Sequence, residues 1–452
     1  MRGWMLLLLC LLPVACSPDG SKAEPDALAG ADSGTFDSRV DTAASPETVV
    51  PDEVTEDSMP DLPSLDALDV DVGAPNPCES PFKEPIALYP DGPKTQIHVA
   101  AASDGSSVWV ALSTPDEGSS FDVVTTRIAC DGKVLVAPFL LHETPLFNEL
   151  DPAIAISGDA VLVAWQQDNG QFPDNLSTYF RTFGVDGTPL SELPVDLPTL
   201  APDTATTANA WMPAVTSTDG GFVLATAAAV EGAQGFQVVL TGVGKDGTVA
   251  ETGTLAAFEP AASQVYPALA SHQGNVLVAW TRQVVDGDDK VQVAVQESNG
   301  SMLAPSDASD QGMSFSGSVA GGDAAYLAFD SGTDSKRTVV VRSLTAPDSS
   351  PCVLGGAGLL NHTPAVVSLA GQPAVVWYEN QGGLKNHLYL RRCAGFPDSP
   401  APAGLLTKVN NTYAAPYPAA LTRVNDHVVF SAWSEGANPD FEAWGRFVVV
   451  GE

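Results

Sequence analysis

The side chains best suited to chemistry stand next to the apolar strands expected along this chain, where those strands should open onto one face. Acidic residues come soon after the second strand of most repeats, and aromatic residues stand just before the first strand. The acids are Asp168, Asp286 with Asp288 and Asp289, Asp330, Glu379 and Glu435, and the aromatic residues are Trp211, Tyr266 and Tyr417. Aromatic walls with a few polar groups are typical of small-ligand sites. These residues therefore predict a ligand face for a sugar, a peptide or a cation.

The same residues have a second interpretation, which the repeat pattern favours. An acidic edge in solvent, with aromatic side chains packed between neighbouring sheets, would give the same sequence pattern. Four tryptophans also recur at the ends of apolar strands, and we interpret them as core residues: Trp165, Trp280, Trp377 and Trp433.

Signatures of known chemistry are otherwise absent from the sequence. The six histidines form no His-x-His or His-Glu-x-x-His pattern, and no Gly-x-Ser-x-Gly elbow, Walker loop or dinucleotide fingerprint occurs. The cysteines lack the CxxC spacing of a zinc site. We therefore predict no catalytic residue, no cofactor and no metal site, and expect a protein that is not an enzyme.

The elements that would position these residues come from a phrase that recurs seven times. It is clearest as PAIAISGDAVLVAW from Pro152, PALASHQGNVLVAW from Pro267 and PAVVSLAGQPAVVW from Pro364. Weaker copies begin at Val99, Pro213, Ser316 and Pro418. Each copy predicts a first strand starting at Pro-Ala and a second strand that is apolar on both faces. A third strand follows, and then a two-residue Asp-Gly or Asn-Gly hairpin leads to a short fourth strand.

Seven such units predict an all-β fold, a seven-bladed β-propeller of four-stranded antiparallel blades. Repeats of this length resemble those of sialidase-like propellers. For an enzyme, that resemblance implies an arginine cluster, a tyrosine nucleophile and acidic partners in a central mouth. Here the arginines recur with the repeat in the third strands, which favours structural pairing with neighbouring blades: Arg127, Arg181, Arg342, Arg391 and Arg446.

The ends of the chain predict how the ring closes. The last repeat stops after its third strand, and the segment around residues 84 to 90 precedes the first repeat with no other partner. We expect it to pair with residues 446 to 450 as the fourth strand of the last blade. In that register Cys78 and Cys130 stand in adjacent blades, as do Cys352 and Cys393. Two disulfides, Cys78–Cys130 and Cys352–Cys393, are therefore predicted, and four free buried thiols are the alternative.

The first residues predict export. Arg2 and the short apolar stretch from Trp4 to Leu12 form a signal peptide over residues 1 to 15, too short to span a bilayer. The sequence Leu-Pro-Val-Ala-Cys16 resembles the lipobox of bacterial lipoproteins, although Pro13 departs from the usual leucine. This resemblance implies a lipid on Cys16, and Ser17 in place of Asp implies the outer membrane. An ordinary cleaved signal with an incidental cysteine is the alternative.

Composition separates residues 16 to 77 from the propeller predicted over residues 78 to 452. The first segment has fifteen acidic residues against Lys22 and Arg39, with Phe36 as its one aromatic. Such a segment cannot bury enough apolar surface to fold, so we expect a disordered, acidic linker. The net charge of −35 excludes nucleic acid as a partner.

Taken together, these patterns predict a lipid-anchored, monomeric binding, adhesion or scaffold protein of the outer membrane, periplasmic or surface-exposed. Its ligand would be a glycan, a peptide or a protein. The alternative is a glycan-active hydrolase of the sialidase-like propeller type. Arginine and glutamate clustered with tyrosine in the central mouth would favour the hydrolase, and their dispersal over the outer strands would favour the scaffold.

Overall fold

The protein divides into residues 1–70 and residues 71–452, and the described residues all belong to the second unit of this computed structural model. The predicted signal peptide, Cys16 and all of the predicted linker except Pro77 lie outside the described residues. No helix among the described residues is long and apolar enough to cross a membrane. The structure describes residues 77–115, 120–142, 147–168, 176–191, 194–197, 210–250, 253–285, 287–309, 313–333, 336–355, 360–380, 386–393, 404–405, 413–414, 418–437 and 440–450.

Four sheets each consist of four consecutive antiparallel strands. The first contains β2 (Ile97–Ser103), β3 (Ser107–Pro115), β4 (Phe121–Ala129) and β5 (Val134–Leu140). The second contains β6 (Glu149–Ser157), β7 (Ala160–Asp168), β8 (Leu176–Gly184) and β9 (Val195–Asp196). The third contains β10 (Ala210–Thr218), β11 (Gly221–Ala229), β12 (Phe236–Gly244) and β13 (Thr254–Leu255). The fourth contains β14 (Ala262–His272), β15 (Asn275–Val284), β16 (Lys290–Gln296) and β17 (Ser306–Asp307).

The remaining strands form a sheet of eight and a sheet of five. The eight are β18 (Met313–Ala320), β19 (Tyr326–Thr333), β20 (Lys336–Ser343), β21 (Cys352–Leu354), β22 (Leu360–Leu369), β23 (Gln372–Asn380), β24 (Asn386–Arg392) and β25 (Gly404–Leu405). One parallel residue pair, Arg337 with Leu360, joins its two antiparallel halves. The five are β26 (Tyr413–Ala414), β27 (Ala420–Arg423), β28 (Val428–Ala437), β29 (Asp440–Val449) and β1 (Ile86–Ala87).

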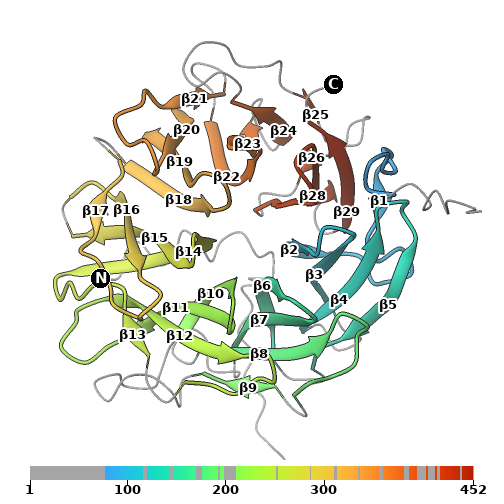
Figure 1. Ribbon diagram of the computed structural model, residues 1–452, viewed down its shortest axis with the longest axis horizontal. Helices are drawn as coiled ribbons and strands as arrows, with labels where there is room; N and C mark the ends of the chain where they lie inside the picture. The colour runs from blue at the N-terminus through green and yellow to red at the C-terminus, as the bar shows by residue number, and fades with distance from the viewer. Residues whose placement is uncertain are drawn as a thin grey trace, which may run out of the picture. The chain divides into compact units, whose positions relative to one another are not determined.

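The sheets follow one another around a common centre, with the first strand of each on the inside (Figure 1). Consecutive first strands contact one another in the order β2, β6, β10, β14, β18, β22 and β27, and β27 contacts β2 again. The described part of the chain is thus all-β with a propeller-like arrangement.

The core lies between the sheets and is supplied mainly by the second strands. Every residue of β3 from Ser107 to Thr114 is buried, and β7 is buried except for Asp168. The tryptophans expected in the core are there, since Trp165, Trp280 and Trp433 are 0% exposed and Trp377 is 2% exposed. The apolar second strands therefore confirm the prediction of burial on both faces.

Buried polar side chains also join neighbouring sheets through backbone groups. Gln264 of β14 accepts a hydrogen bond from the amide of Val238 at 2.9 Å, and Glu149 of β6 accepts one from Val123 at 3.1 Å. The oxygen of Gln96, just before β2, accepts one from the amide of Ala443 in β29 at 3.0 Å. Buried amides must be hydrogen-bonded to avoid a large desolvation cost, so these contacts stabilise the packing of one sheet on the next.

The Asp-Gly and Asn-Gly sequences form hairpins between third and fourth strands, but with three loop residues where we predicted two. In the first, Gly132 donates its amide to Ala129 at 2.9 Å, and Ala129 donates to Lys133 at 2.8 Å. Only the glycine is left-handed, with φ of 86° at Gly132 and 88° at Gly187. The side chain of Asp131 instead accepts the amide of Lys133 at 3.1 Å. This is a right-handed turn closed by a left-handed glycine.

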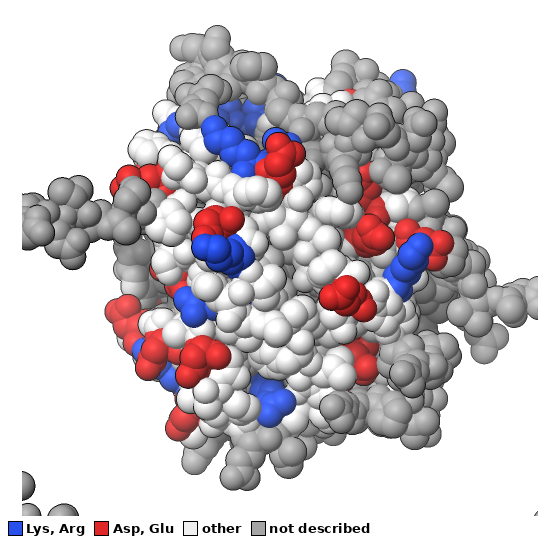
Figure 2. Space-filling model, turned by 90° about the vertical axis from the view of Figure 1, so that its right-hand side faces the viewer, with Lys and Arg blue, Asp and Glu red and all other residues white. Residues whose placement is uncertain are grey.

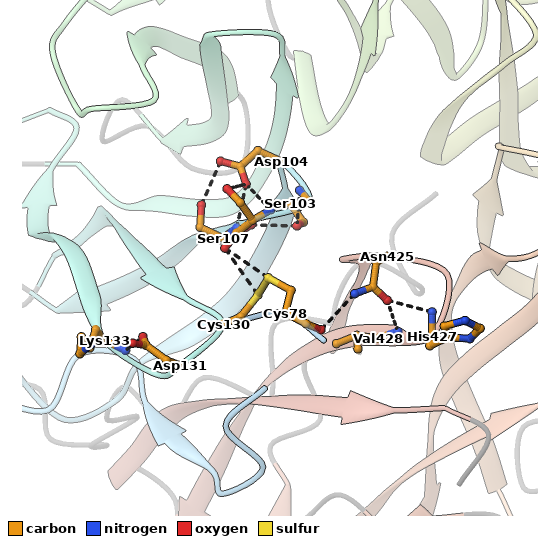
Figure 3. The surroundings of a disulfide bond; sticks show 12 residues. Cys78, Ser103, Asp104, Ser107, Cys130, Asp131, Lys133, Asn425, His427 and Val428 are labelled. Carbon is orange, nitrogen blue, oxygen red and sulfur yellow. Dashed lines mark hydrogen bonds and ion pairs between the residues drawn. A yellow bond between two sulfur atoms is a disulfide. The ribbon is translucent and has the colours of Figure 1, made fainter. Parts of the chain in front are cut away.

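The two disulfides have the predicted pairing, each between neighbouring parts of the ring. Cys78 is bonded to Cys130, at the end of β4, and Cys352 of β21 is bonded to Cys393, just after β24. Figure 3 shows the first bond, where the side chain of Asn425 donates to the Cys78 carbonyl at 3.1 Å. The start of the described chain is therefore held by both the first sheet and the last.

The last sheet includes the N-terminal strand β1, which pairs antiparallel with β29. Ile86 lies opposite Gly445 and Ala87 opposite Trp444, so the contact is slightly N-terminal to the predicted residues 446 to 450. Leu88 continues the contact by donating its amide to Ala443 at 2.9 Å, and its side chain is buried at 2% exposure.

Repeat arginines lie on the outer strands and bond backbone carbonyls. Arg127 donates to Val185 at 2.6 Å, and Arg181 donates to Leu141 at 2.8 Å. These two arginines therefore bond to a neighbouring sheet, as predicted. In Figure 2, acidic and basic side chains are scattered around an uncharged area on the side that lies to the right in Figure 1.

Candidate functional site

The six first strands that the structure describes from their beginnings share one irregularity. In each, one extra residue interrupts the pairing with the second strand, which makes a β-bulge. The bulges lie between Ile97 and Ala100, Leu150 and Ala153, Trp211 and Ala214, Val265 and Ala268, Phe315 and Ser318, and His362 and Ala365. A bulge bends the strand and redirects a side chain, and bulges are frequent beside active sites.

The residues at these bulges have an uncommon backbone conformation. Five of them are left-handed and are not glycine: His98, Asp151, Met212, Tyr266 and Thr363, with φ between 48° and 54°. This conformation costs a residue with a side chain about 1 kcal/mol or more. We call these five residues the bulge ring. We call the end of the sheets where they lie, where first strands begin and second strands end, the bulge face.

The bulge also explains the Pro-Ala phrase of the repeat. We expected the first strands to start at Pro-Ala, and this was wrong: β6 begins at Glu149, before Pro152, and β14 begins at Ala262, before Pro267. Proline lacks an amide hydrogen and is tolerated inside a sheet only at an edge or a bulge. In four of the repeats it directly follows a residue of the bulge ring, so the phrase marks the bulge.

Two members of the bulge ring from adjacent sheets form an ion pair. Nδ1 of His98 on β2 contacts the Asp151 carboxylate on β6, and 39% of the Asp151 side chain remains exposed. Burial raises the pKa of Asp151, but the charge and hydrogen bond of His98 lower it further, so the net shift is downward. Asp151 is therefore an ionised carboxylate that solvent or a ligand can reach.

Tyr266 is the bulge residue of a third sheet. Burial raises the pKa of the Tyr266 hydroxyl, and the charges of Asp151 and Asp289 raise it further. Tyr266 is on β14 and Asp151 on β6, with the β10–β13 sheet between them.

Asp289, just before β16, extends the site toward the next sheet. Burial raises its pKa, the hydrogen bond from Gln283 lowers it, the charge of Asp288 raises it and that of Arg337 lowers it, with a net upward shift. Arg337 lies 3.5 Å from the carboxylate of Asp330, which is 1% exposed. The charge of Arg337 is therefore balanced by a buried partner.

The residues predicted for a ligand face are only partly brought together. Tyr266 belongs to the bulge ring, and Trp211 precedes Met212 with its ring 5.0 Å from that of Phe236. Asp168 is partly exposed and accepts a hydrogen bond from Asn148 at 2.6 Å. Tyr417 and Asp286 lie outside the described residues.

The other three predicted acids are buried at the bulge face. Asp330 pairs with Arg337, Glu435 accepts a hydrogen bond from the Trp433 indole at 2.9 Å, and Glu379 is 9% exposed. Their burial suits them to holding strands and neighbouring side chains in place, because a buried carboxylate is stable only when it is paired.

The sequence analysis missed His98 and Asp151. A signal was available for both, because each stands at the repeat position before Pro-Ala or its equivalent, where the side chain differs between copies. Asp289 is one of the acids that were expected after the second strand of its repeat.

One hollow of about 410 Å³ lies away from the bulge face, at the opposite turns of the β10–β13 sheet. Its lining includes Thr218, Phe222 and Thr248 together with three glycines, and it contains no titratable group. Ligand sites combine apolar walls with placed polar groups, so the bulge face is the better candidate. Among the residues that the structure describes, no group of three or more His, Cys, Asp or Glu side chains could hold a metal ion.

Comparison with solved structures shows the fold. An ulvan lyase of a polysaccharide lyase family, bound to -[GlcA(1-4)Rha3S]-, matches with a TM-score of 0.55 at 13% identity, covering 82% of this chain and 96% of that one. A Trypanosoma rangeli sialidase matches with a TM-score of 0.46 at 11% identity, over 81% of this chain and 57% of that one. The β-propeller domain of a Pyrococcus furiosus protease matches with a TM-score of 0.46 at 9% identity, over 79% of this chain and 99% of that one.

These likenesses are too distant to assign an activity. No model of a known protein family matches the sequence, and no curated protein matches it either. At 13% identity the match to the ulvan lyase shows a similarity of fold alone, and the expectation of a protein that is not an enzyme has no support from it.

Proposed function

We propose that this chain is a lipid-anchored, seven-bladed propeller that binds a glycan at the bulge face. The observation that carries the binding function is that His98, Asp151 and Tyr266 occupy equivalent left-handed positions at one end of three sheets, with His98 paired to Asp151. Strained residues persist where the fold holds them, and they cluster at functional sites. A tyrosine beside accessible carboxylates offers a sugar both a stacking face and hydrogen-bond acceptors.

The seven-bladed count is supported by the strand contacts. The eight-stranded sheet counts as two blades because one residue pair alone joins its halves. The first strands then follow in a circle of seven, and β1 supplies the outer strand of the last blade. The side chain of Gln96 joins the last blade to the first by the same kind of contact that Glu149 and Gln264 make elsewhere.

The anchor belongs to the proposal on sequence grounds alone. A lipid on Cys16 would hold the propeller at the outer membrane, on its periplasmic or its outer side, and residues 17 to 77 would act as a tether. Stable membrane attachment requires more than one acyl chain, and the lipoprotein resemblance implies an anchor with several chains. The acidic composition of the tether would keep it extended.

A binding screen tests the glycan function. The full chain, in a detergent without a sugar headgroup, is applied to a panel of neutral, acidic and amino-sugar oligosaccharides. Tyr266→Ala should weaken binding to the best oligosaccharide by about tenfold or more, because a stacking face is lost. Tyr389→Ala, on outer strand β24, is the matched control and should bind normally. Equal binding by both variants, or no oligosaccharide bound by the full chain, contradicts the proposal.

A glycan hydrolase is the second candidate, and one observation favours it. Asp151 and Asp289 both act on Tyr266, yet the pKa of Asp151 is lowered and that of Asp289 is raised. Carboxyl groups whose pKa values are pushed apart can serve as base and acid in glycoside cleavage. Tyr266 would remain protonated, unlike the nucleophile that the sialidase resemblance implies. Release of reducing ends in the same screen, lost in Asp289→Asn, would establish this candidate.

A further inference from the structure

The strand β5 differs from the other described outer strands in length and composition. It has seven residues, VLVAPFL, and every one of them is apolar. The outer strands β1, β9, β13, β17, β21 and β25 have two or three residues each. Proteins normally shorten or charge an edge strand, because a long apolar edge promotes aggregation. An exposed strand of this kind therefore marks an interaction surface.

Exposed apolar side chains extend from β5 to both of its neighbours. Nine large apolar side chains are exposed among the described residues, and five of them lie together on the first two sheets and the segment before them. We call these five the rim patch: Phe82, Val134, Leu135, Leu140 and Leu190, each between 39% and 53% exposed.

Two hairpins make the rim patch continuous. A side chain added at Gly132, in the hairpin before β5, would lie 3.2 Å from the Phe82 ring. One added at Gly187, in the corresponding hairpin of the second sheet, would lie 3.1 Å from Val136 of β5. Leu190 belongs to that second hairpin and donates its amide to Thr182 at 3.0 Å. The patch therefore runs from the segment of Phe82 across β5 to the next sheet.

The rim patch has few charges around it, although the whole chain carries −35. The ammonium of Lys133 lies 2.7 Å from the carboxylate of Asp131 in the hairpin before β5, so these two charges cancel. β5 is on the right in Figure 1, the side that Figure 2 shows, where an uncharged area is visible. The patch suits a partner without net charge, because a small negative balance remains on the neighbouring described residues. These are Glu79, Lys83, Glu84 and Asp186.

The edge of β5 is protected against pairing with another strand. Pro138 has no amide hydrogen, and the pairing of β5 with β4 shifts its register on either side of Arg127. Proline and bulges on an edge strand prevent the addition of a further strand. A peptide or a second copy of the chain could not continue this sheet through an unbroken ladder. The exposed side chains therefore favour a partner that imposes no register, and a fluid lipid surface is such a partner.

The chain enters the domain beside the rim patch. Pro77 is the first described residue, and the next residue, Cys78, is bonded to Cys130 at the hairpin that leads into β5. Under the proposed lipid anchor, the residues before Pro77 connect this point to the membrane. A tether keeps the domain at a high local concentration beside the lipid, so that a contact too weak to hold a free domain becomes populated.

We propose that the rim patch docks on the membrane that carries the anchor, with Leu135 and its neighbours entering the interfacial layer of zwitterionic phospholipids. This inference rests on the proposed lipid anchor and adds the side of the domain that meets the lipid. Interfacial binding grows with the apolar area that is buried. The bulge face stays uncovered, because it lies at one end of the sheets and β5 is an outer strand.

Quenching by brominated lipid tests the docking. The lipidated full chain, carrying one added tryptophan, is reconstituted into phosphatidylcholine vesicles with and without bromine on the acyl chains. Leu135→Trp should lose about half of its added emission to bromine, because the residue enters the lipid. Val353→Trp is the matched control, since Val353 lies on the outer strand β21 and is 56% exposed, and it should lose little.

Charged variants test whether the apolar side chains make the contact. Val134→Asp/Leu140→Asp, added to the Leu135→Trp chain, should remove most of the quenching, because carboxylates are costly to bring into hydrocarbon. Val285→Asp/Leu303→Asp changes two exposed apolar side chains beside the β14–β17 sheet and should leave the quenching unchanged.

Each outcome has a defined meaning. Failure of the full chain to float with the vesicles overturns the lipid anchor, and the docking with it. Flotation with equal quenching of Leu135→Trp and Val353→Trp overturns the docking and leaves the anchor standing. Quenching that survives Val134→Asp/Leu140→Asp overturns the docking too. A dimer in detergent that Val134→Asp/Leu140→Asp dissociates would assign the rim patch to a second copy of the chain and overturn the lipid contact.

Discussion

His362 shows how the bulge face sets the chemistry of a single residue. Burial and then the charge of Arg337 lower the pKa of His362 to about 4, against a smaller opposing effect of its hydrogen bond with Asn386. Its ring stacks on Tyr378 with centroids 5.7 Å apart. The folded protein therefore holds His362 neutral at pH values where the unfolded chain protonates it.

This shift predicts an acid-sensitive stability. Between pH 6.5 and about 4 the unfolded state alone binds the His362 proton, so the free energy of unfolding falls as the pH falls through that range. The loss attributable to His362 is about 2–3 kcal/mol, and below the folded pKa it should not grow further. Urea denaturation of the full chain and of His362→Gln, at half-unit pH steps, measures the difference. Parallel curves for the two proteins over this range would contradict the prediction.

At the scale of strands, the sequence predicts the features that lie within a single repeat, such as strand burial and hairpin turns. The run Val161-Leu162-Val163-Ala164-Trp165 is apolar on both faces, and its burial follows directly from that pattern. The glycines at 132, 187, 247 and 300 mark hairpins because only glycine adopts a left-handed turn at little cost. Both disulfides follow from the repeat register, because equivalent positions in a ring face equivalent neighbours.

The features that the sequence could not predict arise between repeats. The strand β1 is only two residues long, and two residues of a strand do not define their own register. The bulge was hidden because Pro152 and Pro267 look like the start of a strand, and proline is normally excluded from a strand interior. The pairing of Asp151 with His98 depends on how two separate sheets pack against each other.

The segment before β2 should contribute much more stability than its two paired residues indicate. It holds Leu88 in the core and carries Cys78, whose disulfide to Cys130 closes a separation of 52 residues. Such a disulfide stabilises by about 4 kcal/mol, and burial of a leucine adds about 2 kcal/mol. A chain beginning at Thr95 should therefore be about 6 kcal/mol less stable than one beginning at Pro77, as measured by urea denaturation.

The matched control for this truncation is Cys78→Ser/Cys130→Ser in the chain that begins at Pro77. It lacks the disulfide but keeps β1 and Leu88, and it should lie between the other two proteins. If the chain beginning at Thr95 unfolds at the same urea concentration as the one beginning at Pro77, β1 does not support the last sheet.

At the scale of the molecule, we expect different roles for the acidic linker and for the domain of described strands. The linker predicted over residues 16 to 77 carries fifteen acids, so it gains nothing from collapsing onto a domain that is itself acidic. The described strands already bury their apolar faces against one another around the ring. We expect such a domain to fold without the linker, and under the lipoprotein proposal the linker would hold the bulge face away from the anchor.

The anchor can be tested without disturbing the domain. Cys16→Ser removes the thiol that would carry the lipid, and nothing else in the predicted export signal changes. An acidic domain has little intrinsic affinity for an anionic membrane surface. The variant should therefore move from the membrane fraction to the soluble fraction. Fractionation followed by immunoblotting measures this, with Cys10→Ser as the matched control that should stay on the membrane. Retention of Cys16→Ser on the membrane would show that another part of the chain holds it there, and the lipoprotein proposal would be wrong.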